Sequence, residues 1–230
     1  MLWPHLIQTQ EKTFNGIGPF DRDILKDLES GESFSGKVWL PSFPIIVLGR
    51  FSSVRDVKPD VLAKEIPIVR RMGGGGTVLL GNQTPVVEFG FVEKGRYPMK
   101  HYACTIAEIF IHNFRKRGVP VDFDESWYDY TIHDRKVGGS TFCVMKNKIV
   151  YGAVFIHEAS IIELIEEMLN VPGKQPEYRR NRSHKEFLTA LEYFGLDLED
   201  VLEILENSMN TFKNIILGRK NRGRDKTSQV

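Results

Sequence analysis

A glycine-rich stretch between two apolar runs is the first feature of this sequence that could do chemistry. Residues 66–81 read IPIVRRMGGGGTVLLG, in which Arg70 and Arg71 precede four consecutive glycines at 73–76. Glycine lets backbone N–H groups approach a ligand closely, and successive N–H groups form concavities that bind anions. Guanidinium groups suit phosphate because their planar fork donates two parallel hydrogen bonds. The stretch therefore predicts a strand, an anion-binding loop and a second strand.

The spacing of these glycines differs from that of the common phosphate loops. The stretch has no Gly-Lys-Ser/Thr ending, so it is not a P-loop. Its glycines are contiguous and lead into a strand, whereas the dinucleotide fingerprint spaces its glycines and opens a helix. A flexible glycine hairpin with two solvated arginines is the alternative interpretation, and the loop taken alone leaves that alternative open.

A lysine before paired glycines is the second chemical feature. Lys136 precedes Gly138 and Gly139, which are expected to interrupt a strand, and residues 146–148 predict the hairpin turn that follows. Glycines in a strand often mark the close approach of a ligand. A lysine at such a place can put its charge on a phosphate or on a developing oxyanion. The alternative is a solvated lysine at a strand end.

Composition limits the classes of protein that this chain can represent. The 230 residues suit one large globular domain, and a formal net charge of +1 gives no general attraction to nucleic acid or membrane. Two cysteines, Cys104 and Cys143, do not suggest a disulfide framework or a zinc site. No apolar run approaches the roughly 20 residues that span a bilayer. The N-terminus lacks the pattern of a signal peptide, so the protein is expected to be cytoplasmic.

Helices and strands alternate along the chain in a way that would position these features. The clearest amphipathic helix covers 99–117, and Cys104 within it is expected to be buried or half-buried. Residues 218–230 are basic and polar and are expected to form a disordered tail behind a single domain of residues 1–217. Apolar spacing predicts further helices near 19–31, 59–65, 159–168, 183–193 and 197–216, and strands near 36–40, 44–48, 84–92, 128–132 and 149–157.

Three blocks of the sequence together resemble the lipoate–protein ligase family, which has the biotin/lipoate protein-ligase fold. The blocks are PIIVLGRFSSV at 44–54, VRRMGGGGTVLLGN at 69–82 and YDYTIHDRKVGGST at 128–141. They look like the family's strand ending in Gly-Arg, its Arg-Arg-X-Ser-Gly-Gly-Gly loop and its Asp…Gly-Arg-Lys-X-X-Gly-Ser segment, in the family's order. The resemblance covers residues 44–162.

The resemblance implies an α+β fold with a central mixed, mostly antiparallel sheet flanked by helices. It also implies a reaction in two steps. The carboxylate of lipoate or octanoate attacks ATP to give an acyl-adenylate, and a lysine of a lipoyl domain then attacks the adenylate to give an amide and AMP. Mg²⁺ assists by neutralising triphosphate charge. The implied acceptors are lipoyl domains of 2-oxoacid dehydrogenase complexes or the glycine cleavage H protein, and short family members can need an accessory subunit.

The resemblance carries functional roles over to individual positions. Lys136 is implied to contact the acyl carbonyl and the α-phosphate and to stabilise the developing oxyanion in both steps. Asn82 and Asp129 are implied to lie on the metal side of the site. The implied adenylate-binding residues are Arg71, Gly76, Thr77, Val78, Leu79 and Lys136, and the implied lipoate-binding residues are Arg70, Gly74, Gly75 and Lys136.

Two positions depart from the family's motifs. Gly73 stands where the motif has a serine before its three glycines, and Tyr151 stands where the motif has His before Gly. In addition, only helices and a tail are expected after Pro172, which leaves no room for the large C-terminal domain of the long ligases. These departures bear on the adenylation step more than on acyl transfer.

Three other functions compete with the ligase interpretation. An octanoyltransferase would use a cysteine thioester, but the two positions where such enzymes carry the nucleophile, at 121–123 and at 172–173, contain no cysteine here. Cys143 is close to Lys136 in sequence, but strand alternation does not guarantee that the two side chains share a face. A biotin ligase would need a Gly-Arg-Gly-Arg-type loop, which the centre of the chain lacks. A catalytically silent protein that binds lipoate or a lipoyl domain is the third alternative, and Gly73 and Tyr151 favour it.

Overall fold

The main element of the fold is a six-stranded antiparallel sheet. The computed structural model describes residues 19–64, 66–93, 95 and 99–225. Strands in the sheet follow the order β1-β5-β9-β8-β7-β6, so the long β8–β9 hairpin lies at its centre. Their bounds are β1 Phe34–Trp39, β5 Val86–Val92, β6 Val121–Asp124, β7 Asp129–Ile132, β8 Arg135–Met145 and β9 Lys148–Phe155.

A second, three-stranded sheet carries the glycine loop. Its order is β3-β2-β4, with β2 at Ile45–Leu48, β3 at Ile68–Arg70 and β4 at Val78–Leu80. β2 pairs with β3 in parallel and with β4 in antiparallel orientation, and the glycine loop joins β3 to β4. The α+β class expected from the sequence is confirmed. The mixed pairing, however, lies in this small sheet, whose central strand β2 is buried at all four residues, as is usual for a strand with a parallel neighbour.

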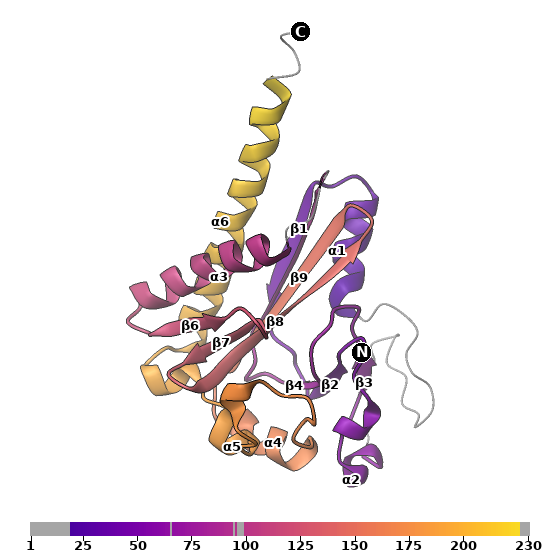
Figure 1. The fold of residues 1–230 in the computed structure, drawn as a ribbon, viewed down its shortest axis with the longest axis vertical. Helices are drawn as coiled ribbons and strands as arrows, with labels where there is room; N and C mark the ends of the chain where they lie inside the picture. Colours follow the sequence, from indigo (N-terminus) through magenta and orange to yellow (C-terminus); the bar gives the residue numbers. More distant parts are fainter. Residues whose placement is uncertain (1–18, 65, 94, 96–98, 226–230) are drawn as a thin grey trace.

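Helices cover the large sheet unequally. α3 (Met99–Lys116) and α6 (Leu198–Asp225) pack together over one face, and α1 (Pro19–Glu29) packs on the other face against β1, β5 and β9 (Figure 1). The remaining helices are η1 Val54–Asp56, α2 Pro59–Leu62, α4 Ser160–Met168, η2 Glu177–Arg179, α5 His184–Phe187 and η3 Leu191–Phe194. None of the described helices combines the length and the apolar character that crossing a bilayer requires.

Strand alternation on β5 explains why the two faces of the large sheet differ. Val87, Phe89 and Phe91 are fully buried against α3 and α6, and each large apolar side chain buried there contributes about 1.5–3 kcal/mol. The alternate residues, Val86 and Glu88, point to the other face. That face is covered by α1 at one end and by the small sheet at the other, and this arrangement leaves space between them for a site.

Three local expectations differ from the structure. The helix expected over 183–193 is two short pieces, α5 and η3, because residues 188–189 are extended and Thr189 N–H donates to the Lys136 carbonyl. β8 runs through Gly138 and Gly139 without the expected interruption. The chain from Gly218 to Asp225 continues α6 beyond the sheet (Figure 1), since each further residue of a formed helix adds a hydrogen bond; residues 226–230 lie outside the described part.

Candidate functional site

A cavity lies on the face of the large sheet that α3 and α6 leave free. Its walls come from both sheets, from the glycine loop and from residues 169–187, which cover it from the side of α4 and α5. The cavity therefore collects residues that are distant in sequence. Its lining includes both chemical features expected from the sequence, the glycine loop and Lys136.

One wall of the cavity is apolar. Its residues come from β2, β4, β5 and β9 and belong to the cluster that joins the small sheet to the large one. They are Val47, Val78, Leu80, Val86 and Val154. A wall of branched aliphatic side chains suits a hydrocarbon chain, because burying apolar surface is favourable by about 25 cal/mol per Å².

The rest of the lining is strongly charged. Four cationic residues face three acidic ones, so the cavity combines a place for an apolar chain with a place for an anion. The cationic residues are Arg71, Lys136, Lys174 and Arg179, and the acidic residues are Asp56, Glu88 and Asp129. Such a lining suits an amphipathic ligand with an anionic head.

The glycine loop is wrapped around the Arg71 side chain. The Arg71 guanidinium donates hydrogen bonds to the Gly74 carbonyl at 2.7 Å and to the Gly76 carbonyl at 2.8 Å. Between them, Gly75 has φ +85°, a conformation that L side chains rarely adopt, and a Cβ there would lie 2.8 Å from the Arg71 Nη2 atom. The loop thus needs glycine at position 75 for both its backbone and its packing.

The two departures from the ligase motifs have different structural settings. A Cβ at Gly73 would lie 2.4 Å from the Thr141 Oγ1 atom, which donates to the Gly74 carbonyl at 3.0 Å. The Thr141 side chain therefore fills the space that the motif's serine would need. Tyr151 points into the core and its hydroxyl meets that of Tyr130 at 2.9 Å, so this departure does not reach the cavity.

A bulge brings Lys136 to the cavity side of β8. Thr131 of β7 pairs with Lys136 of β8, but the adjacent residue of β7, Tyr130, pairs with Gly138. The extra residue, Val137, is fully buried in the core behind the sheet. Bulges re-aim side chains and are common beside active sites. The strand is therefore continuous through the paired glycines, and its irregularity is this bulge at Val137.

Lys136 is held by a chain of polar contacts. Its Nζ atom lies 2.5 Å from Asp129 Oδ1, and the Tyr178 hydroxyl donates to Asp129 Oδ2 at 2.8 Å. A Cβ at Gly139 would lie 3.0 Å from the Lys136 Nζ atom, so the glycine makes room for the ammonium group. Burial and the charge of Asp129 raise the pKa of Tyr178 above its ordinary value, so its hydroxyl stays a donor.

Arg179 is a cavity residue that sequence reasoning missed. Only 4% of it is exposed, its guanidinium stacks over the Phe187 ring at 4.6 Å, and no carboxylate of the described residues forms an ion pair with it. Burial lowers the pKa of Arg179. The burial of His184, together with the charge of Arg179, lowers the pKa of His184 to about 4, so His184 is neutral at pH 7. A buried cation of this kind suits an anionic ligand. In the sequence it looks like part of a solvated basic run, because residues 179–182 read RRNR.

Most of the residues expected at the site line the cavity. The structure brings together Arg71, Gly75, Gly76, Thr77, Val78, Asp129 and Lys136. Thr77 is fixed by its hydroxyl, which donates to Asp56 Oδ2 at 2.6 Å. Thr77 and Asp56 thereby connect the glycine loop to η1.

Four expected residues do not line this cavity. Arg70 turns away and donates to carbonyls of the loop that follows β2, and Gly74 offers its carbonyl to Arg71 and Thr141. Leu79 is buried on the other side of β4, among residues of α4 and α5. Asn82 is exposed in the turn after β4. For Leu79 the position follows from strand alternation, which sends the neighbours of Val78 and Leu80 to the opposite face of β4.

A magnesium ion would find few protein ligands in this cavity. Among the described residues, no group of three His, Cys, Asp or Glu side chains could hold a metal ion. Asn82 and Asp129 do not meet, and both Asp129 oxygens already have partners. Mg²⁺ that is bound mainly by substrate phosphates needs only one or two carboxylates, and Asp129 and Asp56 both line the cavity. The lining therefore fits an ion that arrives with a nucleotide.

Comparison with known proteins matches the cavity-bearing region to one family. The model of the lipoyl protein ligase A/B catalytic domain matches residues 21–210. A curated relative, the inactive lipoate–protein ligase 2 of Plasmodium falciparum (isolate 3D7), is 23% identical over 229 residues. That match covers 84% of this chain and 59% of the relative, so the chain spans about three fifths of the relative's length.

Two solved structures are similar in fold. Lipoate-protein ligase A bound with ATP superposes with a TM-score of 0.69 at 15% identity, over 86% of this chain and 78% of the other. The second belongs to an archaeal lipoylation system, a bi-partite lipoate protein ligase and its E2 lipoyl domain from Thermoplasma acidophilum. It has a TM-score of 0.64 at 17% identity, over 82% of this chain and 72% of the other.

Proposed function

Because the chain belongs to the lipoyl protein ligase A/B catalytic-domain family, we propose that it is a lipoate–protein ligase. It activates lipoate or octanoate with ATP and transfers the acyl group to a lysine of a lipoyl domain. The observation that carries this proposal is a cavity in which an apolar wall meets Lys136 and three further cationic residues. ATP bound to a structural neighbour with this fold supports the choice of nucleotide.

The proposed substrates fit the cavity in one orientation. The hydrocarbon chain lies along the apolar wall from Val47 to Val154, and its carboxylate lies beside Lys136. The nucleotide phosphates lie at the glycine loop beside Arg71, and Arg179 adds positive charge to the cavity. Mg²⁺, when bound with the nucleotide, offsets the charge of the phosphates, and Asp129 or Asp56 would hold it.

Lys136 has the same electrostatic role in both proposed steps. In the first, a carboxylate oxygen forms a bond to the α-phosphorus of ATP while the bond to pyrophosphate breaks. In the second, the acceptor amine attacks the acyl carbon, and the bond to the AMP oxygen breaks as the amine loses a proton. Negative charge develops near the acyl carbonyl and the α-phosphate, and a preorganised ammonium group stabilises it. Asp129 and Tyr178 hold Lys136 in position.

The proposed partners follow from the same reaction. They are lipoate or octanoate and the lipoyl domains of 2-oxoacid dehydrogenase complexes or the glycine cleavage H protein. An accessory subunit is a further proposed partner, and it is supported by the bi-partite ligase with the same fold. A catalytically silent binding protein is the second candidate function, because the curated relative is named an inactive ligase.

The decisive experiment measures the mass of an acceptor lipoyl domain after incubation with this protein. One reaction contains lipoate and Mg-ATP, and another contains octanoyl–acyl carrier protein without ATP. Addition of one lipoyl group that depends on ATP supports the ligase. Transfer from the carrier protein alone supports an octanoyltransferase instead. Tight lipoate binding without transfer in any combination supports the silent binding protein.

We expect the two cysteines to be dispensable for the reaction. Neither lines the cavity: Cys143 is buried beside Ile24 and Leu25 of α1, and Cys104 lies on α3. Burial raises the pKa of the Cys104 thiol, which is the opposite of what a nucleophilic thiolate needs. The double variant Cys104→Ser, Cys143→Ser should keep ATP-dependent acylation within about tenfold of the wild type, a barrier change of about 1.4 kcal/mol.

Far-UV circular dichroism of the same variant controls for loss of folding at Cys143. A folded but inactive double variant would argue for a cysteine relay. So would a hydroxylamine-sensitive acyl group on Cys143 of the wild type, detected by peptide mass spectrometry.

A further inference from the structure

The loop after β2 exposes an aromatic side chain beside the cavity. Phe51 is 86% exposed, the largest exposed fraction among the large apolar residues of the described part of the chain. A single exposed apolar residue needs no explanation in itself. The loop around Phe51, however, is held more firmly than an ordinary surface loop.

Arg70 clamps this loop from within. One atom of its guanidinium, Nη1, lies within hydrogen-bond distance of three carbonyl groups of this loop, at 2.7 Å from Gly49, 3.2 Å from Arg50 and 2.8 Å from Ser52. This explains why Arg70 does not reach the cavity. A loop fixed in this way loses little conformational entropy when a partner binds.

The clamped loop also rests on the glycine loop. Arg50 N–H donates to the Gly73 carbonyl at 2.9 Å, and the Ser52 hydroxyl donates to the Gly75 carbonyl at 3.2 Å. The contact is so close that a Cβ at Gly49 would lie 2.0 Å from the Gly75 carbonyl oxygen. Since Gly75 lines the cavity, a partner that binds Phe51 lies next to the reacting groups.

Two arginines give the exposed loop a positive charge. The Arg50 guanidinium lies over the Phe51 ring, with its central carbon 5.4 Å from the ring centroid, and Arg55 is exposed on η1. Neither arginine has a carboxylate partner among the described residues. Aromatic and arginine side chains dominate the binding energy of protein interfaces. The complementary surface is therefore acidic and carries an apolar depression.

We propose that Phe51, Arg50 and Arg55 form the docking surface for the acceptor protein, a small folded domain with acidic residues around its target lysine. The proposal rests on the proposed function, because that reaction requires an acceptor lysine to enter the cavity. Phe51 is the apolar anchor, and the two arginines orient the acidic surface. The acceptor backbone then meets the enzyme beside the glycine loop, so that the lysine side chain reaches Lys136.

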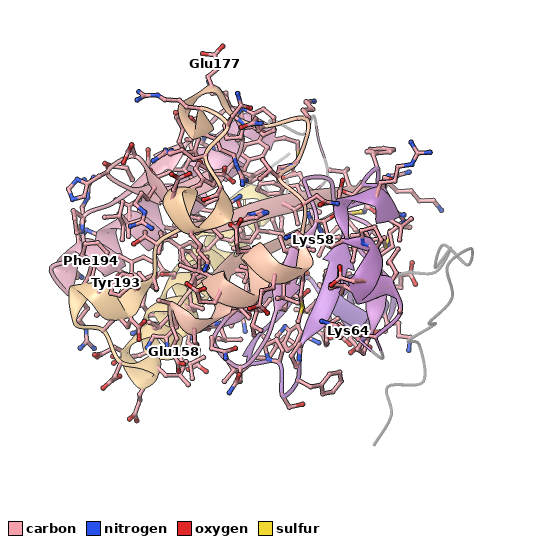
Figure 2. The ribbon with its side chains drawn as sticks, turned by 90° about the horizontal axis from the view of Figure 1, so that it is seen from below. Lys58, Lys64, Glu158, Glu177, Tyr193 and Phe194 are labelled. Carbon is pink, nitrogen blue, oxygen red and sulfur yellow. The ribbon has the colours of Figure 1, made fainter. Side chains whose placement is uncertain are left out.

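The test compares Phe51→Ala and Arg50→Glu with a matched control, Tyr193→Ala. Tyr193 is also strongly exposed, at 62%. It lies across the molecule from Lys58, which follows the Phe51 loop in the sequence (Figure 2). Adenylate formation is measured by pyrophosphate release, acceptor recognition by the KM for a lipoyl domain, and direct binding of that domain by isothermal titration calorimetry.

We expect Phe51→Ala and Arg50→Glu to raise the acceptor KM and the binding Kd at least tenfold. Pyrophosphate release and the KM for lipoate should stay unchanged, and Tyr193→Ala should match the wild type in every assay. An unchanged acceptor KM with normal pyrophosphate release would refute the docking surface and leave the ligase function intact. Loss of self-association in Phe51→Ala, seen by sedimentation with an unchanged KM, would assign the loop to contacts between copies of this chain.

The binding measurement separates this proposal from the function on which it rests. If the wild type forms no adenylate but binds a lipoyl domain, and Phe51→Ala weakens that binding, the docking surface stands and the ligase function is wrong. If the wild type binds no lipoyl domain and modifies none, both proposals are wrong.

Discussion

Replacement of Lys136 by alanine should lower the rate of acyl transfer by about 10²–10³-fold, because it removes a preorganised charge from the developing oxyanion. The structure supports this expectation through the position of Lys136 in the cavity and its contact with Asp129 at 2.5 Å. Transfer should be followed by mass spectrometry of the lipoyl domain under single-turnover conditions. Lys148→Ala, at the far end of the same hairpin, is the matched control and should keep full activity.

The Lys136→Ala variant also leaves a buried carboxylate without its cation, which can destabilise the fold. Asp129 is 5% exposed, so the double variant Lys136→Ala, Asp129→Asn is needed to remove that unpaired charge. If the double variant is as stable as the wild type in urea unfolding and remains inactive, the loss of activity comes from the reaction chemistry and not from unfolding. A folded Lys136→Ala protein with normal activity would exclude the proposed mechanism.

Replacement of Gly75 by alanine should weaken binding of an acyl-adenylate analogue by tenfold or more. Gly75 has φ +85°, and a left-handed conformation costs an L residue about 1–2 kcal/mol. The new Cβ would also press on the Arg71 Nη2 atom at 2.8 Å and displace the side chain around which the loop is wrapped. The Kd of a non-hydrolysable adenylate analogue, measured by isothermal titration calorimetry, gives the size of the effect.

Gly74→Ala is the matched control for this loop. Gly74 has no positive φ, and a Cβ there would meet nothing within 4 Å. The control should therefore bind the analogue as the wild type does, which separates loop geometry from a general loss of flexibility. Equal binding by both variants would mean that the glycine run is only a flexible hairpin, the interpretation that the sequence left open.

The sequence could predict features that depend on neighbouring residues. The amphipathic spacing along α3 places Tyr102, Ile106 and Phe110 on one buried face, as expected. The apolar runs on both sides of the four glycines form β3 and β4, with the loop between them. Arg71 and Lys136 each lie beside glycines, a pattern compatible with an anion site, and the resemblance to the lipoate–protein ligase family implied their roles. For α3 and for the strands, the periodicity of one element is enough to decide which side is buried.

Only the tertiary structure decided which residues share the cavity. Arg70, the last residue of β3, clamps the loop after β2, whereas the glycine loop wraps around the adjacent Arg71, which follows the strand. The bulge on β8 sets the orientation of Lys136, and bulges have no clear sequence signal here. Arg179 lies in the cavity because a segment more than 40 residues beyond Lys136 folds back over the sheet. Such long-range contacts depend on how whole helices and strands pack together. Local patterns along the chain carry no information about that packing.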